Sequence, residues 1–478
     1  MPRRNRRWPQ TIVATAVSIG LAVAPSSSPA AFAADNPSLT EGKAMTLEEA
    51  LAYAHAHHPS LRSAVARVAA AAADSRVPRA QWLPTFGATV QAFEGTTNNT
   101  TASYVGVPDV DLPRIGGTKV GDPRMSSSAA WTPSTSTLAA VGGGQEIFDF
   151  GRIAAQAAVA DHTFEAETHR AERERLRLDL MVKEAFYGVL AARDVLRAAQ
   201  EAFTRARGHR DLAAAGVKSG LHAPIEQTRA EAELTRFEVG QIRASGSVRR
   251  ARAVFAAAVG VDAPLLDAAG EPPALVPAPP LNEALEQAAR EDPALKESRA
   301  RADATDARAR AIAAELRPDL ALTAAFSGRA GTATPSSGSL AGQYGPLPSV
   351  ANWDVGLVLR WPLFDPVVTA RRRAAEARAV GAHADLAVLT QQERAAVQET
   401  YVILEVSQAA LVSLDHAVQA AHANYAQAEA RFKAGLGTSL EIADAETLRT
   451  ESEIQLALGR YDVHRARAVL AQALRDLE

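Results

Sequence analysis

The sequence predicts a mainly α-helical protein with a membrane β component, built from a duplicated unit of helix, β-hairpin and long helical hairpin. Three observations carry this prediction: two long proline-free stretches, short segments of alternating hydrophobicity, and matching landmarks in the two halves of the chain. The 478 residues include no cysteine, which excludes a disulfide framework and a thiolate nucleophile. The formal net charge of −3 shows none of the basic excess typical of nucleic-acid binding.

The first 33 residues have the pattern of a secretory signal peptide. Four arginines within residues 3–7 precede an apolar stretch at residues 11–24, and Ala31 and Ala33 are the small residues before a cleavage site. The apolar stretch is too short to cross a bilayer as a helix. We therefore predict export and cleavage after Ala33, by either the general or the twin-arginine route.

The two halves of the chain share one order of landmarks. The matched pairs are residues 47–51 with 281–285, 148–149 with 364–365, and 218–221 with 433–436. Such self-similarity indicates two copies of one structural unit. We predict a first repeat at residues 34–261, a proline-rich linker at residues 262–280 and a second repeat at residues 281–478.

Each repeat contains a stretch suited to an unusually long helix. Residues 151–221 and 367–478 contain no proline and are rich in Ala, Arg, Glu and Leu, which are strong helix formers. A helix from Arg152 to Lys218 would be about 100 Å long at about 1.5 Å per residue. Apolar residues with heptad-like spacing form a packing seam at positions 397, 401, 404, 411, 414, 418 and 425. We therefore expect the long helices to pack side by side.

Glycine-leucine pairs mark the ends of these helices. Gly220 and Gly435 can adopt the left-handed conformation that closes a helix C-terminus. The chain then returns in a second helix in each half. We predict long helical hairpins at about residues 151–258 and 367–475.

The segments between the helices alternate with a period of two, which is typical of β-strands. The clearest runs from Trp353 to Trp361, where every second residue is apolar and a tryptophan stands at each end. A length of about 26 Å suits a tilted strand with one face in lipid and aromatic residues at the interfaces. We predict β-hairpins at about residues 84–148 and 318–364. An edge hairpin of a soluble sheet is the alternative.

Four strands cannot close a barrel alone, and lipid does not tolerate an open sheet edge. Two chains would give eight strands, whose interior side chains fill, whereas three chains would give twelve strands and room for a channel. Residues 95–136 and 328–350, rich in Gly, Pro, Ser and Thr, are predicted to be the exterior loops of the hairpins. An open pore therefore predicts a trimer.

This order of landmarks resembles the TolC-like outer-membrane efflux protein family, the outer membrane factors. The likeness covers the chain from about Met45 onward and is carried by residues 47–51 with Pro59, by Leu83-Pro84, by residues 148–151 and by residues 435–440. The resemblance implies a homotrimer in which a twelve-stranded β-barrel in the outer membrane continues into a twelve-helix α-barrel in the periplasm.

The resemblance also implies a function. It is that of the outer-membrane channel in a tripartite efflux or type I secretion system, a passive exit duct surrounded by outer-membrane lipid. Such a channel docks to a periplasmic adaptor, or membrane fusion protein, and to an inner-membrane pump. The alternative is a periplasmic coiled-coil scaffold or adaptor without a membrane barrel, which would share the heptads but not the strands. The pattern leaves the cargo open among drugs, metals, small molecules and polypeptides.

Two groups of site residues follow from the resemblance. The hairpin tips, Gly220-Leu221 and Gly435-Leu436, correspond to the adaptor-docking loops. An exposed leucine beside a glycine also offers an anchor and a close backbone approach. The plain alternative is an ordinary helix cap. Trp353 and Trp361 are predicted to be membrane-interface aromatics.

The second group is the gate. Glu441 and Asp444 match the acidic constriction of the family, and their spacing puts them on one helix face. In a trimer they would form rings of carboxylates that attract cations. Glu226 matches the acidic residue of the family latch, but its usual hydroxyl and basic partners are replaced here by Phe432 and Gly437. We therefore expect a different closing contact.

The sequence contains no enzyme motif. It lacks HExxH and GxSxG, and Gly142-Gly143-Gly144 is not followed by a phosphate-loop lysine. His55, His57 and His58 form the histidine cluster, without a carboxylate at a convincing ligand spacing. We therefore predict no catalytic residues, no cofactor and no bound metal, which disfavours a secreted hydrolase.

Overall fold

The computed structural model describes residues 44–96, 133–331 and 350–474. The predicted signal peptide at residues 1–33 lies outside the described residues, as do most of the two predicted exterior loops. All the described residues belong to one compact unit, Ser38–Glu478.

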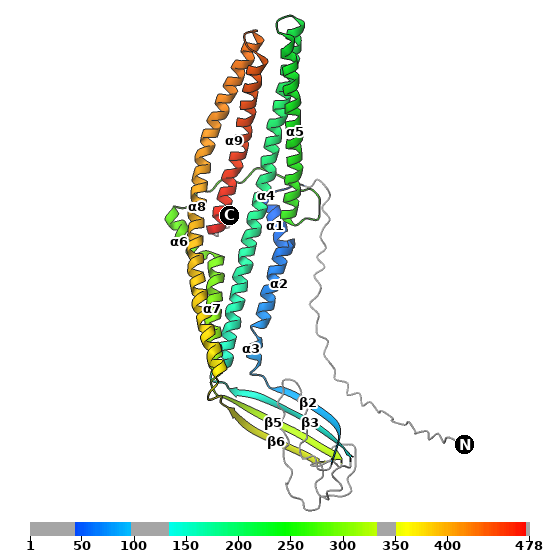
Figure 1. The fold of residues 1–478 in the computed structure, drawn as a ribbon, viewed down its shortest axis with the longest axis vertical. Helices are drawn as coiled ribbons and strands as arrows, with labels where there is room; N and C mark the ends of the chain where they lie inside the picture. Colours follow the sequence, from blue (N-terminus) through cyan, green and yellow to red (C-terminus); the bar gives the residue numbers. More distant parts are fainter. Residues whose placement is uncertain (1–43, 97–132, 332–349, 475–478) are drawn as a thin grey trace, which may run out of the picture. The chain divides into compact units, whose positions relative to one another are not determined.

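The two halves of this unit repeat one order of long elements (Figure 1). The first half contains β1 (Ala44–Met45), α1 (Leu47–His57), α2 (Pro59–Asp74), α3 (Val77–Ala80), β2 (Thr85–Thr96), β3 (Pro133–Phe148), α4 (Arg152–Lys218), α5 (Pro224–Val259) and β4 (Asp267–Ala268). The second contains α6 (Leu281–Glu291), α7 (Pro293–Ala314), β5 (Asp319–Gly331), β6 (Val350–Arg360), α8 (Pro366–Lys433) and α9 (Ser439–Leu474).

The long helices have the lengths that their proline-free sequences predict. Helix α4 has 67 residues and α8 has 68, so each is about 100 Å long. The matched Phe-Asp landmarks are their start signals. Asp149 accepts hydrogen bonds from the backbone N–H groups of Gly151 and Ile153, and Asp365 accepts them from Val367 and the next residue. Each aspartate thus satisfies donors that would otherwise be unpaired at a helix N-terminus.

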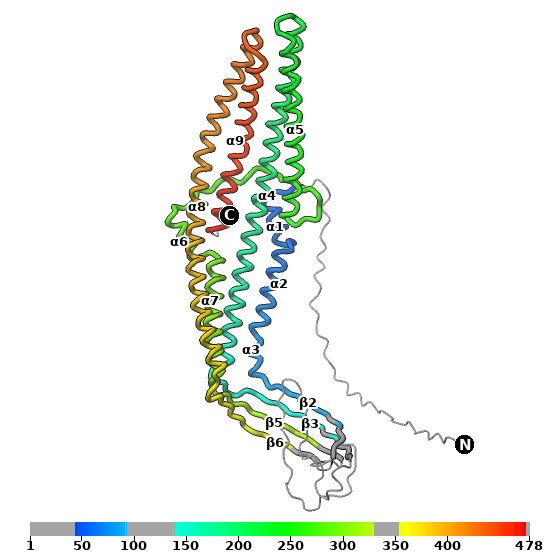
Figure 2. The backbone as a smooth tube through the Cα atoms, viewed as in Figure 1, coloured from blue at the N-terminus to red at the C-terminus, as the bar shows by residue number. Residues whose placement is uncertain are grey.

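Helix α4 is the central packing element. It contacts α5 and α9 along one part of its length and α2 and α7 along another, as the backbone trace shows (Figure 2). Its core contact is an aromatic cluster in which Phe186 packs edge to face on Phe255 of α5, with ring centroids 5.8 Å apart. In α8, Val397 and Leu404 of the predicted heptad seam are buried against Leu470 of α9. The seam is therefore a real helix-packing surface.

The predicted linker is more structured than its composition indicates. Strand β4 lies within residues 262–280 and pairs in parallel with β1, opposite Ala44 and Met45. Leu266 is buried beside it, and the Asp267 carboxylate pairs with Arg193 and with Arg252, the latter at 2.7 Å. A two-residue strand leaves no periodic signal in the sequence, so this short pairing within the predicted proline-rich linker could not be predicted.

The four longer strands form one antiparallel sheet in the order β2-β3-β5-β6. The two predicted hairpins are present, and β3 also pairs with β5, so strands from both halves share the sheet. Val141 of β3 lies opposite Phe326 of β5, which in turn lies opposite Trp353 of β6. Because directly opposed residues lie on the same face, the register aligns the apolar positions of successive strands.

Candidate functional site

One face of the four-stranded sheet is apolar and uncovered. The register puts the following exposed side chains on it: Phe86 and Val90 of β2, Val141 of β3, Leu322 and Phe326 of β5, and Trp353, Val355, Leu357 and Leu359 of β6. The opposite face is mainly small or polar, apart from Val358, and has Thr85, Gly144, Thr323 and Gly356 in one row across all four strands. A soluble sheet would bury such an apolar face against other elements.

The two tryptophans predicted at the membrane interfaces are both exposed. Trp353 is 76% exposed and lies within β6, while Trp361 is 57% exposed and follows the last residue of that strand. Further large apolar side chains are exposed around the strand ends that lead to the helices, namely Trp82, Leu83, Phe148, Leu363 and Phe364. No helix in the described parts of the chain is long and apolar enough to cross a bilayer.

The two hairpin tips have the same backbone geometry. Gly220 and Gly435 both have φ of 72°, the left-handed conformation predicted for them. In each tip the leucine N–H donates to the carbonyl five residues earlier, at 2.9 Å, and the glycine N–H donates to the carbonyl three residues earlier. This pair of hydrogen bonds is the Schellman motif, which ends a helix, so the leucine after the glycine lies outside the helix. Leu221 and Leu436 are exposed, as an anchor for a partner requires.

The two tips also lie next to each other. A Cβ atom at Gly435 would stand 3.2 Å from Cδ1 of Leu221. The first and second hairpins of the chain therefore meet at their ends, and both docking candidates belong to one surface.

Glu441 and Asp444 lie at the start of α9 beside the second tip. Both are exposed in the isolated chain, and the N–H of Glu441 donates to Oγ1 of Thr438 at 3.3 Å. Its carboxylate stands 3.4 Å from Nε of Arg431. An acidic residue in the first turn of a helix interacts favourably with the helix dipole. Both carboxylates are free of the core, as a lumenal ring would require, and their role as a constriction stays a prediction.

Glu226 joins the two hairpins. Its Oε2 accepts a 2.7 Å hydrogen bond from the N–H of Ser439, the first residue of α9, and its backbone carbonyl accepts the Ser439 hydroxyl at 3.2 Å. Its Oε1 lies 3.2 Å from the Arg229 guanidinium. Burial acts to raise the pKa of Glu226, but the hydrogen bonds from Ser439 and the charge of Arg229 together hold the pKa below its ordinary value. The carboxylate of one hairpin thus caps a helix of the other.

Phe432 cannot make a polar contact, yet its ring lies at the centre of the contact between the two hairpins near their tips. We call this contact the first junction. Its ring is buried and stacks on the His222 ring at 4.3 Å between centroids, almost parallel, while the His209 ring meets it edge to face at 4.9 Å. His209 belongs to α4 and Phe432 to α8, so the stack also joins the two hairpins. Gly437 contributes no side chain. A Cβ atom at this position would stand 3.1 Å from the backbone nitrogen of Phe432, which leaves little room for a side chain.

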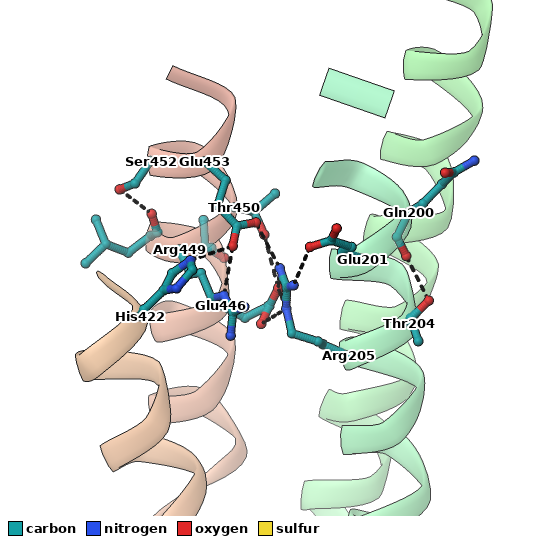
Figure 3. A network of polar contacts seen from close by, with 12 residues as sticks. Gln200, Glu201, Thr204, Arg205, His422, Glu446, Arg449, Thr450, Ser452 and Glu453 are labelled. Carbon is teal, nitrogen blue, oxygen red and sulfur yellow. Dashed lines mark hydrogen bonds and ion pairs between the residues drawn. The ribbon is translucent and has the colours of Figure 1, made fainter. Parts of the chain in front are cut away.

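A second junction lies further along the same helices, around Arg205 of α4 (Figure 3). Its guanidinium reaches both oxygens of Glu446 in α9, at 2.9 and 3.0 Å, and Glu453 at 3.3 Å. The side chains of Arg205 and Glu446 are only 16% and 4% exposed. Thr450 donates to Glu446, and His422 and Arg449 contact Glu453. The network is a buried, charged connection between the two halves of the chain.

The histidine cluster near the N-terminus has structural contacts. His55 contacts Asp179 of α4, and Nδ1 of His58 accepts the Ser60 N–H at 3.2 Å, which caps α2. Across the described residues, no group of three or more His, Cys, Asp or Glu side chains has a geometry that could hold a metal ion.

Comparison with known families settles the classification. The family model described as outer membrane efflux protein matches residues 50–261 and 284–474, which together make up most of the chain. The chain belongs to the outer membrane efflux protein family. The resemblance predicted from the sequence landmarks is therefore confirmed, and the uncovered apolar sheet fits a protein of the outer membrane.

Solved structures of outer-membrane channels share this efflux protein's fold. The channel OprN is 21% identical, with a TM-score of 0.72 over 92% of this chain and 94% of its own. VceC from Vibrio cholerae is 19% identical, with a TM-score of 0.70 over 90% and 95%. The open state of MtrE from Neisseria gonorrhoeae is 18% identical, with a TM-score of 0.69 over 92% and 94%. No curated protein sequence matches significantly.

Sequence reasoning missed several residues at the junctions of this efflux protein. His209, His222, Arg205 and Glu453 carry no motif and stand in alanine-rich helical sequence or next to a tip. Their partners in the other half of the chain lie more than two hundred residues away. One signal was available for Glu446: it occupies the position in the second repeat that Glu231 occupies in the first.

Proposed function

We propose that this efflux protein is the outer-membrane channel of a tripartite efflux or type I secretion system, assembled as a homotrimer. The observation that carries the proposal is the exposed apolar face that runs across all four strands, with an opposite face that is mainly small and polar. That distribution suits a barrel wall with lipid outside and water inside. Transport through such a duct is passive.

The sheet edges support the oligomeric state. Among the described residues, β2 pairs only with β3 and β6 only with β5, so the sheet has two free edges. Three copies of four strands form a twelve-stranded barrel, which leaves a lumen wide enough for solutes. Helices α4, α5, α8 and α9 of three copies supply twelve helices for a periplasmic tunnel. A periplasmic scaffold, the alternative function, would leave the apolar face in contact with water.

Recordings in planar bilayers test the proposal and the acidic constriction together. The purified protein is expected to migrate as a heat-modifiable trimer and to form cation-preferring channels. Replacing Glu441 and Asp444 by Ala removes the carboxylate rings, so cation preference and block by divalent cations are expected to fall severalfold. Glu238→Ala, an exposed acidic residue of α5 far from the tips, is the control. Water-soluble monomers without conductance would instead support the scaffold function.

Crosslinking from the hairpin tips tests docking. Photoreactive residues at positions 221 and 436 are expected to capture a periplasmic adaptor in cells, because both positions are exposed next to a left-handed glycine. Position 242, an exposed isoleucine of α5 in the same hairpin as position 221, is the matched control and is expected to give a much weaker product. Equal labelling from all three positions would argue against docking through the tips. The captured adaptor also identifies the pump that works with the channel.

A further inference from the structure

We propose that the closed contact between the two hairpins is a latch made of the His209–Phe432–His222 ring stack and the Glu226–Ser439 clamp, and that a proton taken up by His209 releases it. The proposal rests on the proposed function, because it assigns the regulation of the gate at the periplasmic end of the channel. Phe432 and Gly437 stand where the family latch has a hydroxyl and a basic residue, and neither can make that polar contact. The ring stack and the clamp are the different closing contact that these two residues require.

The latch joins all four helices of the two hairpins. His209 comes from α4, Phe432 from α8, Glu226 from α5 and Ser439 from α9. Phe432 is also part of a buried cluster with Ala213, Ala230 and Ile442, which lie on α4, α5 and α9. If the hairpins separate, the ring stack and the clamp must both break. The contacts are therefore specific to the arrangement in which the tips are together.

The backbone of the first tip fixes the ring of His222. The N–H of His222 donates to the carbonyl of Gly216 at 3.2 Å, and its ring lies directly on that glycine. A Cβ atom at Gly216 would overlap the imidazole, so glycine is required here if the ring is to reach Phe432. A Cβ atom added at Gly208, on the same helix, would meet no atom within 4 Å. Gly216→Ala and Gly208→Ala are therefore a matched pair of variants, because only the first places a Cβ atom against His222.

His209 gives the latch its sensitivity to protons. The side chain is 7% exposed, and neither ring nitrogen has a hydrogen-bond partner among the described residues. A buried imidazole without partners is stable only when neutral, because a charge there loses its hydration. Burial is the main cause that lowers the pKa of His209 from 6.5, and the nearby His222 also lowers it. The carboxylates that face it, Glu226 of α5 and Glu429 of α8, act in the opposite direction but do not prevail.

The direction of the pH effect follows from the difference between the pKa of His209 in the closed hairpins and its pKa in the separated hairpins. When the hairpins separate, water reaches His209 and its pKa returns toward 6.5, so protons bind preferentially to the open state. The latch is fully effective above this value and weakens as the pH falls from 6.5 through the lowered pKa of the closed state. Within that window the ratio of open to closed tips changes by up to about tenfold per pH unit for each chain. The hydrogen bonds from Ser439 lower the pKa of Glu226, so they favour the charged form of this carboxylate.

The test is the pH dependence of conductance in planar bilayers between neutral pH and about pH 5. The wild-type channel is expected to open increasingly as the pH falls. His209→Phe keeps an apolar ring in the stack but cannot take up a proton, so its conductance is expected to stay low at every pH. Gly216→Ala displaces His222 and is expected to raise conductance severalfold at neutral pH, while Gly208→Ala behaves as wild type.

The outcomes separate this inference from the proposed function. A wild-type protein that forms no channel at any pH contradicts the proposed function itself. A wild-type channel whose rise at low pH persists unchanged in His209→Phe overturns the latch, as does a Gly216→Ala channel that stays closed. Trimer migration and circular dichroism check each variant for folding. If His209→Phe does not assemble, the comparison of Gly216→Ala with Gly208→Ala still decides whether the ring stack holds the tips.

Discussion

Replacing Arg205 with alanine is expected to lower the free energy of unfolding by about 3–5 kcal/mol, because the substitution leaves a buried carboxylate without its cation. The Glu446 side chain is 4% exposed, and burial already raises its pKa in spite of Arg205. Without the guanidinium, Glu446 must either take up a proton or remain charged in a site of low polarity. Both cost stability. The connection between α4 and α9 is thereby weakened at its most buried polar point.

Guanidinium unfolding followed by circular dichroism, at fixed protein concentration in one detergent, measures the effect of Arg205→Ala. Arg197→Ala is the matched control: it lies on the same helix, pairs with Asp194, and its side chain is 65% exposed. Its loss is expected to stay within about 1 kcal/mol. Replacing both Arg205 and Glu446 with apolar residues is expected to cost much less than Arg205→Ala alone. Equal effects for Arg205 and Arg197 would show that the buried network contributes no special stability.

Leu357→Arg is expected to prevent stable insertion of the proposed trimer into the outer membrane. Leu357 lies midway between the two tryptophans of the β6 region, on the exposed apolar face. An arginine on the lipid face of a β-barrel costs about 2–4 kcal/mol at the bilayer midplane. The substitution occurs in every subunit, so the cost in a trimer is threefold. Membrane fractionation and heat-modifiable migration are the measurements.

The adjacent residue provides the control for Leu357→Arg. Val358 is also exposed but lies on the opposite face of the sheet, because successive side chains of a strand alternate. On the proposed barrel this face lines the water-filled lumen, so Val358→Arg is expected to leave assembly intact and to change ion selectivity. If Val358→Arg abolishes assembly and Leu357→Arg does not, the two faces of the wall have been assigned the wrong way round.

The elements of the fold were predictable where the signal is local. The absence of proline sets the extent of α4 and α8, and the left-handed glycines at positions 220 and 435 mark where they end. The alternation that begins at Trp353 identifies β6, although its last tryptophan falls one residue beyond the strand. These features depend on backbone sterics and on side-chain periods of a few residues, which a single sequence displays directly.

The contacts between the two halves were not predictable in the same way. The pairing of β3 with β5 brings Val141 opposite Phe326, and the ring stack brings His209 onto Phe432. Such pairs depend on how the duplicated units pack, and they carry no periodic signal of their own. The sequence did indicate that Phe432 removes the expected polar latch. It could not show that two histidines, distant along the chain, would enclose the ring.

The unpaired outer strands have a consequence for the life of a single subunit. Among the described residues, β2 and β6 each have one side without a strand partner, and backbone amides and carbonyls there cannot enter hydrocarbon unpaired. The apolar face of the sheet is in turn unfavourable in water. If the protein assembles as proposed, a single chain is therefore stable neither in water nor in lipid before it meets its neighbours. On the proposed trimeric barrel, the interval before three chains have joined their edges is therefore the stage most exposed to aggregation.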